Sequence, residues 1–130
     1  MAYNNSVTNA AGQLSAITAT IAYTDTSAVT IGTIPAGAQI ISINIDVTTA
    51  FNAGTTNTVT VGKTGSAAAF VAATSVGSAG RASVATTGVY SAWANVGTSD
   101  VDYATVTYSQ TGTAASAGAA RVTIVYKAFA

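Results

Sequence analysis

The stretch that decides the fold reads "IISINIDVT" at residues 40–48. Aliphatic and polar residues alternate through it, and the aliphatic ones are all β-branched: Ile41, Ile43, Ile45 and Val47. Successive side chains of a β-strand point to opposite faces, so a period of two is typical of a strand with one buried face. The segment therefore predicts a strand whose buried face is formed by these four side chains.

The same alternation recurs along the chain, at residues 17–23, 29–31, 59–61, 104–108 and 122–126. The last two runs are joined by the small-residue segment "TGTAASAGAA", and we predict that they form a hairpin pair. At residues 34–37, "IPAG" places Pro35 second and Gly37 fourth, which is the preference of a type I turn between adjacent strands. Between residues 63 and 100 the alternation is blurred, although short strands fit near residues 70, 84 and 90.

These patterns define the fold class. No window of a dozen residues keeps a helical apolar stripe, and about seven to nine short strands fit in the chain. We predict an all-β protein, an antiparallel β-sandwich of jelly-roll type, with an immunoglobulin-like sandwich as the alternative. Residues 1–13 lack alternation and predict an extended N-terminal arm, which leaves residues 14–130 as a single β-sandwich domain.

The charge content is unusually low. Only 6% of the residues are charged, four cationic and four acidic, against a typical share of about 25%. A chain of this size exposes about 6,000 Å² when folded, or roughly 800 Å² per charge, which is about what one partner contributes to a standard interface. The composition therefore predicts a surface that lies against other proteins. The alternative is a single soluble domain with a mild Thr/Ser surface.

The sequence lacks the residue types on which most catalytic chemistry depends. The chain has no histidine, cysteine or glutamate, so neither a Ser-His-Asp nor a Cys-His nucleophile can be assembled, and the common zinc sites lose their ligands. Asp100 and Asp102 would point the same way on a strand and could bind calcium in an enzyme or lectin, but Asp at a strand start more often caps a turn. We predict a non-enzyme with no catalytic residue, metal or cofactor.

The sequence also bears on nucleic-acid and membrane partners and on the compartment in which the protein folds. Four scattered cations, matched by four aspartates, give no basic stripe, so we expect no nucleic-acid partner. The opening "MAYNNSVTNAAGQLSA" has neither the basic region nor the apolar core of a secretory signal, and no run approaches 18 apolar residues, so we expect no membrane partner and folding in the cytoplasm.

One segment could recognise a sugar. "VYSAWANVG" at residues 89–97 holds Tyr90, Trp93 and Asn95, and an exposed aromatic pair with an amide could stack on and hydrogen-bond a glycan. The other interpretation is that Trp93 fills the core, because Tyr90 and Trp93 would face opposite ways on a straight strand.

Two long stretches carry a family resemblance: "TIPAGAQIISINIDVTTAFNAGTTNTVTVG" at residues 33–62 and "DYATVTYSQTGTAASAGAARVTIVY" at residues 102–126. They resemble small virion structural proteins of tailed bacteriophages, which are capsid decoration (cement) proteins or head and tail fibre components. The recurring positions are Pro35 and Gly37 for a turn and Phe51 and Val59 for packing, so the resemblance carries no site residue.

The resemblance implies a location and a partner. It implies a β-sandwich without enzymatic activity, made in the host cytoplasm and placed on the capsid surface of the virion. There it would bind the major capsid protein, contact neighbouring copies of itself, and stabilise the phage head. The alternative is a fibre or adhesin domain that binds host-surface glycan, for which Tyr90, Trp93 and Asn95 are the candidate contacts.

Overall fold

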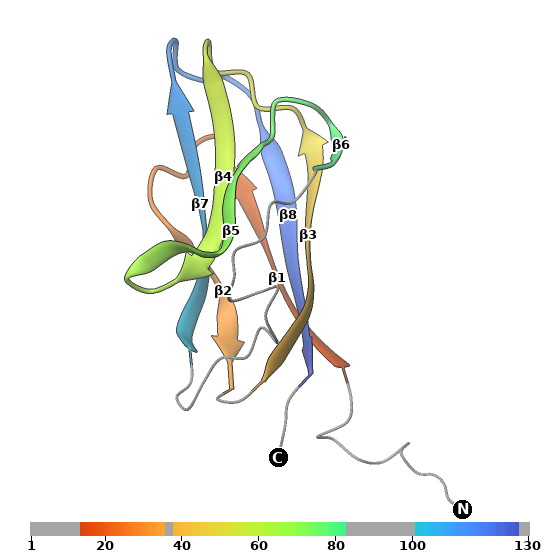
Figure 1. Ribbon diagram of the computed structural model, residues 1–130. Helices are drawn as coiled ribbons and strands as arrows, with labels where there is room; N and C mark the ends of the chain where they lie inside the picture. The colour runs from red at the N-terminus through yellow and green to blue at the C-terminus, as the bar shows by residue number, and fades with distance from the viewer. Residues whose placement is uncertain (1–13, 36–37, 83–100, 128–130) are drawn as a thin grey trace, which may run out of the picture.

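The chain is seen in a computed structural model that describes residues 14–35, 38–82 and 101–127, with the backbone alone for residues 101–103 (Figure 1). This part of the chain contains strands and no helix. The strands are β1 (Leu14–Ala22), β2 (Val29–Ile34), β3 (Gln39–Thr49), β4 (Thr56–Lys63), β5 (Ser66–Ser75), β6 (Gly80–Arg81), β7 (Val101–Thr111) and β8 (Ala119–Lys127). No helix able to span a membrane occurs within these residues.

The strands form two four-stranded antiparallel sheets that pack face to face (Figure 1). Sheet A has the order β1-β8-β3-β6, and sheet B has the order β2-β7-β4-β5. The paired strands are therefore nested: β1 pairs with β8, β2 with β7, β3 with β6 and β4 with β5, as in a long hairpin rolled around a core. The predicted antiparallel β-sandwich is confirmed, and this strand order is that of a jelly roll rather than of the immunoglobulin-like alternative.

The core lies between the sheets and is built by the inward residues of each strand. Its largest fully buried side chains include Phe51, Phe70, Ile21, Ile34, Ile45 and Ile124. Phe51 follows the end of β3, and its ring centroid lies 4.5 Å from that of Tyr108 on β7. Phe51 and Val59 were expected to pack in the interior, and both are buried.

The buried face of β3 differs from the prediction by one residue. Ile43, Ile45 and Val47 are buried as expected, but Ile41 is 42% exposed and Ile40 is buried in its place. Ile40 lies opposite Tyr126 and Ser42 lies opposite Val125, so the register with β8 shifts and Ile41 is the extra residue of a β-bulge. A bulge redirects a side chain locally, and here it turns Ile41 outward.

The predicted hairpin between the last two strands is wrong. β7 pairs with β2 and β4 in sheet B, whereas β8 pairs with β1 and β3 in sheet A. The connecting segment therefore crosses from one sheet to the other. Both strands bury an alternate row of apolar residues, and the two rows face the same core from opposite sheets. Alternation alone does not show whether two such strands pair within one sheet or face each other across the core.

The expected turn at residues 34–37 is also revised. Residues 36 and 37 lie outside the described part, but Ala38 N–H donates to the Pro35 carbonyl at 3.2 Å, which places the turn one residue later than predicted. The strands that it joins, β2 and β3, lie in different sheets and are not neighbours. The predicted arm at residues 1–13 also lies outside the described residues.

Candidate interaction surface

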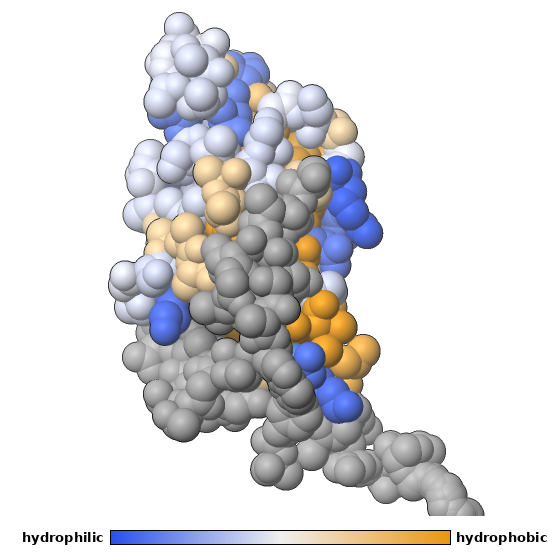
Figure 2. All heavy atoms as spheres, in the orientation of Figure 1, coloured by the Kyte–Doolittle hydropathy of each residue, from blue (hydrophilic) through white to orange (hydrophobic). Residues whose placement is uncertain are grey.

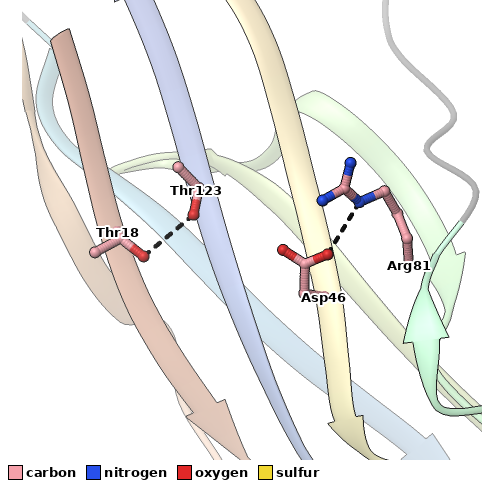
Figure 3. Close-up of polar contacts among 4 residues, drawn as sticks. All are labelled: Thr18, Asp46, Arg81 and Thr123. Atoms are coloured by element: carbon pink, nitrogen blue, oxygen red, sulfur yellow. Dashed lines mark hydrogen bonds and ion pairs between the residues drawn. The ribbon is translucent and has the colours of Figure 1, made fainter.

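The side of sheet A that faces away from sheet B is its outer face, and its centre is polar. Thr18 on β1, Thr123 on β8 and Asn44 on β3 lie side by side in register. The Thr18 and Thr123 hydroxyls are 3.3 Å apart (Figure 3), and the Thr18 hydroxyl also donates to the Val122 carbonyl at 3.0 Å. These residues alternate with core residues along each strand, so the period-two pattern itself places the hydroxyls outside.

One end of the outer face is charged. Asp46 on β3 lies between Arg121 on β8 and Arg81 on β6 in the sheet register. Arg81 Nε donates to Asp46 Oδ1 at 3.0 Å, with 67% of the arginine side chain exposed (Figure 3). An exposed pair of this kind contributes about 0–1 kcal/mol to stability. Its main effect is therefore on the charge that the face presents to a partner.

The opposite end of the outer face carries exposed apolar side chains beside one cation, Lys127, which lies opposite Leu14 in the register of β1 and β8. Leu14 is 61% exposed and Ile41 is 42% exposed, and Val125 lies opposite Ala16 on one side and Ser42 on the other. We call Leu14, Ala16, Ile41 and Val125 the apolar patch. Figure 2 shows strongly hydrophobic side chains at the lower right, where Figure 1 draws the lower part of sheet A, with hydrophilic side chains beside them.

The outer face of sheet B has a different chemistry. Its β4 and β7 strands present hydroxyl residues in register: Thr60 opposite Thr107, Thr58 opposite Ser109, and Thr56 opposite Thr111. The Thr56 and Thr111 hydroxyls are 2.6 Å apart and share a hydrogen bond, whereas the Thr107 hydroxyl is buried and has no hydrogen-bond partner within the described residues. Along these two strands the outer face is polar and uncharged and presents no large apolar side chain.

A hollow of about 450 Å³ lies where the β4–β5 hairpin, residues 63–67, stands beside Ala28, Thr30 and Thr105. It is lined by hydroxyls, small apolar groups and one cation, Lys63. Among these lining residues there is no carboxylate, histidine or cysteine.

The residues predicted to bind ligands are not among those whose side chains are described. Tyr90, Trp93, Asn95 and Asp100 lie outside the described residues, and Asp102 lies on β7 with only its backbone described. Across residues 14–35, 38–82 and 101–127, no group of three or more acidic, histidine or cysteine side chains could hold a metal ion. The glycan and calcium hypotheses therefore remain predictions.

Asp25 shows what an aspartate does at a strand end in this fold. Its Oδ2 accepts a hydrogen bond from Ala22 N–H at 2.7 Å, and its own N–H donates to the Ala22 carbonyl at 2.9 Å. The carboxylate therefore closes the turn after β1 instead of facing a ligand. This is the local role that Asp side chains commonly have in turns.

The period-two pattern of the sequence does not indicate the apolar patch. A strict alternation through β3 would bury Ile41, yet the doublet Ile40–Ile41 interrupts that alternation, because two consecutive residues cannot both face the core in a regular strand. The doublet was therefore the available signal for a bulge. Leu14 offered no such signal, since it stands at the very start of a strand.

Comparisons with known proteins support the fold. No protein-family model matches the chain, and no curated protein matches it. Among solved structures, a chain of the structure described as "Cyanophage Pam1 capsid asymmetric unit" is similar, with a TM-score of 0.60 and 20% sequence identity over 98% of each chain. At this identity the similarity shows a shared fold over nearly the whole length.

Proposed function

We propose that this chain is a non-enzymatic structural protein of a bacteriophage virion, a decoration (cement) protein that binds the major capsid protein and stabilises the head. The observation that carries the proposal is the fold shared with a chain of a phage capsid asymmetric unit over 98% of both chains. The coverage matters because the similarity extends over nearly the whole of both chains and is not confined to a short common fragment.

The surface is consistent with this role. An interface that buries few charges avoids the desolvation cost that each unpaired charge brings, and this chain has only eight charged side chains. The apolar patch supplies the kind of centre that stable interfaces have, and hydroxyl residues around it supply hydrogen bonds. Neighbouring copies on a capsid could meet through other parts of the same weakly charged surface.

The experiment compares particles with and without the protein. Deleting its gene, or stripping it from particles, should lower the temperature at which the shell opens, and adding purified protein should restore it, because a ligand that binds only the assembled shell stabilises that state. Calorimetry or dye release on heating measures the difference. Gel densitometry of purified particles should show copies in the hundreds.

The alternative function, a fibre or adhesin domain that binds host glycan, predicts the opposite pattern. Particles without the protein would then open at the same temperature but fail to adsorb to cells. Copies would number in the tens or fewer. That outcome would replace the cement proposal.

A further inference from the structure

We propose that the free edge of β1 pairs with β1 of a second copy of this chain, antiparallel and about a two-fold axis, so that the A sheets of the two copies form one continuous sheet. This pairing is independent of the proposed function above, because it concerns the isolated protein as much as the particle. Three features of β1 support it: the regularity of its edge, the direction of its backbone groups, and the incomplete burial of its inward side chains.

β1 is the least protected edge of the sandwich. Among the described strands, β1 and β6 are the edges of sheet A, and β2 and β5 are the edges of sheet B. β6 is only two residues long, and β2 and β5 each have two register shifts against the strand beside them. β1 instead pairs with β8 over nine residues without a shift, and it contains neither a charge nor a proline. Short, bulged or charged edges discourage pairing with another chain, so β1 is the edge that remains open to it.

The backbone groups of β1 show which residues face this edge. Tyr23 N–H donates to the Gly118 carbonyl at 3.0 Å and so continues the ladder with β8. Backbone groups alternate between the two sides of a strand, so the odd-numbered residues of β1 bond to β8 and the even-numbered residues point to the free edge. Ala22 fits this alternation, because its N–H donates to Asp25 Oδ2 at 2.7 Å and its carbonyl accepts from Asp25 N–H at 2.9 Å. The turn thus closes the edge at Ala22 and leaves the rest of the strand open.

The open part of the edge is symmetric about Ile17. With Ile17 on the two-fold axis, Leu14 lies opposite Thr20 of the second copy, and Ala16 lies opposite Thr18 of the second copy. Every even-numbered residue of the open edge then meets another even-numbered residue, and each such pair can exchange both of its N–H···O bonds. A register shifted toward the turn would instead meet backbone groups that are already bonded within the chain.

The inward side chains of β1 gain burial in the same register. Ile17 and Ala19 are only partly buried, whereas Ile124 and Val122, their neighbours on β8, are fully buried. Pairing places Ile17 against Ile17 of the second copy and Ala19 against Ser15 of the second copy. The margin of the core that lies open at this edge is thereby covered, and the apolar area removed from water adds to the hydrogen bonds.

No charge opposes the approach of a second copy at this edge. The charged side chains of sheet A lie on β3, β6 and β8, and they are Asp46, Arg81, Arg121 and Lys127. Across the junction, β8 of one copy is three strand spacings, or about 14 Å, from β8 of the other. Exposed charges at this separation are largely screened at physiological salt, where the screening length is about 8 Å. A second copy therefore fits the edge without a repulsive contact.

The first experiment measures association of the full-length protein by analytical sedimentation. Ala16→Pro should weaken association about tenfold or more, because it removes an N–H that faces the free edge and leaves the ladder with β8 intact. Ala16→Thr is the control: it keeps the N–H and suits a strand, so it should associate like the wild type. Circular dichroism and the melting temperature show whether each variant is folded.

The second experiment tests the register by disulfide trapping, which is possible because the chain has no cysteine. A mixture of the Ala16→Cys and Thr18→Cys proteins should form a disulfide rapidly, because the two positions lie opposite each other at a Cα separation of about 5.5 Å, which a disulfide can span. Either variant alone should crosslink more slowly, since its two cysteines are diagonal neighbours at about 7–8 Å. A mixture of Ala16→Cys with Thr123→Cys, on β8, is the control for random collision.

Rapid trapping in the first mixture, together with loss of association in Ala16→Pro, supports the second copy as the occupant of the edge. A wild-type protein that stays monomeric, and variants that crosslink no faster than the collision control, overturn it. A wild-type dimer that Ala16→Pro leaves intact meets through another surface, which also overturns it. So does a monomer whose even-numbered β1 amides resist hydrogen exchange, because its own residues then cover the edge. Crosslinking of Thr18→Cys alone, faster than the mixture, overturns the register. None of these results bears on whether the protein binds capsids.

Discussion

Gly118, just before β8, lies so close to the ring of Phe51 that a Cβ on this glycine would overlap the ring atoms Cγ and Cδ2. Its φ of +149° is also a conformation that side-chain-bearing residues rarely adopt. The Gly118 carbonyl accepts a hydrogen bond from Tyr23 N–H at 3.0 Å, so the backbone has little freedom to move away. Phe51 can therefore fill its place in the core only because residue 118 is a glycine.

Gly118→Ala should lower the free energy of unfolding by about 2–4 kcal/mol, since it adds an overlap in the core to an unfavourable backbone conformation. Urea unfolding followed by circular dichroism measures the loss. Gly77→Ala is the control, because a Cβ there meets no atom closer than 3.8 Å. Equal stability of the two variants would contradict the packing described for Phe51.

The bulge in β3 is tested by two neighbouring isoleucines. Ile40 is 3% exposed and Ile41 is 42% exposed. Ile40→Ala should therefore cost about 2–5 kcal/mol of unfolding free energy, as large-to-small core substitutions do, whereas Ile41→Ala should cost at most about 0.5 kcal/mol. Thermal or urea unfolding of the two variants distinguishes them. The reverse order of stability would mean that β3 is regular and that Ile41 faces the core.

The Tyr108 hydroxyl links β7 to Asn57 on β4, and the Asn57 side chain in turn holds Ala53 in the segment before that strand. The Tyr108 hydroxyl donates to Asn57 Oδ1 at 2.7 Å, and the same oxygen accepts from Ala53 N–H at 2.9 Å. Tyr108→Phe should therefore cost only about 1 kcal/mol of unfolding free energy, because Asn57 keeps its second partner. A loss of more than about 3 kcal/mol in urea unfolding would mean that the hydroxyl makes stabilising interactions beyond its hydrogen bond to Asn57.

The same residue gives an alkaline pH dependence. Burial raises the pKa of Tyr108 above the ordinary value of 10.0, so the folded state holds this proton more tightly than the unfolded state. Stability from this group is present below about pH 10 and is lost as the pH rises through the folded pKa. Tyr108→Phe should lose less stability between about pH 9 and pH 11 than the wild type. Identical slopes for the two proteins would contradict this assignment.

Attachment to the particle should resist salt. If the contact is centred on apolar groups, raising the salt to about 1 M, where the screening length is about 3 Å, should leave the protein bound. Pelleting particles at increasing salt and comparing the bound protein on a gel measures retention. Release at moderate salt would show that exposed charges hold the complex together, and it would contradict an interface centred on the apolar patch.

The sequence by itself determined the strands and most of their buried faces. Alternation is local information: each inward residue of β8, such as Val122 or Ile124, is marked by its polar neighbours whatever strand lies beside it. The absence of a helical apolar pattern in the sequence and the low charge are equally properties of the chain. These features were therefore predictable, and the fold class followed from them.

Only the tertiary structure decided which strands pair and where the register shifts. β7 and β8 follow one another in the chain but belong to opposite sheets, because each completes a sheet with strands that are distant in sequence. Ile40 and Ile41 are equally hydrophobic, and the pairing of β3 with β8 selects Ile40 for the core and turns Ile41 to the surface. Pairing and register depend on contacts between distant residues, so the local pattern is compatible with several arrangements, and the packing of the whole sandwich selects one.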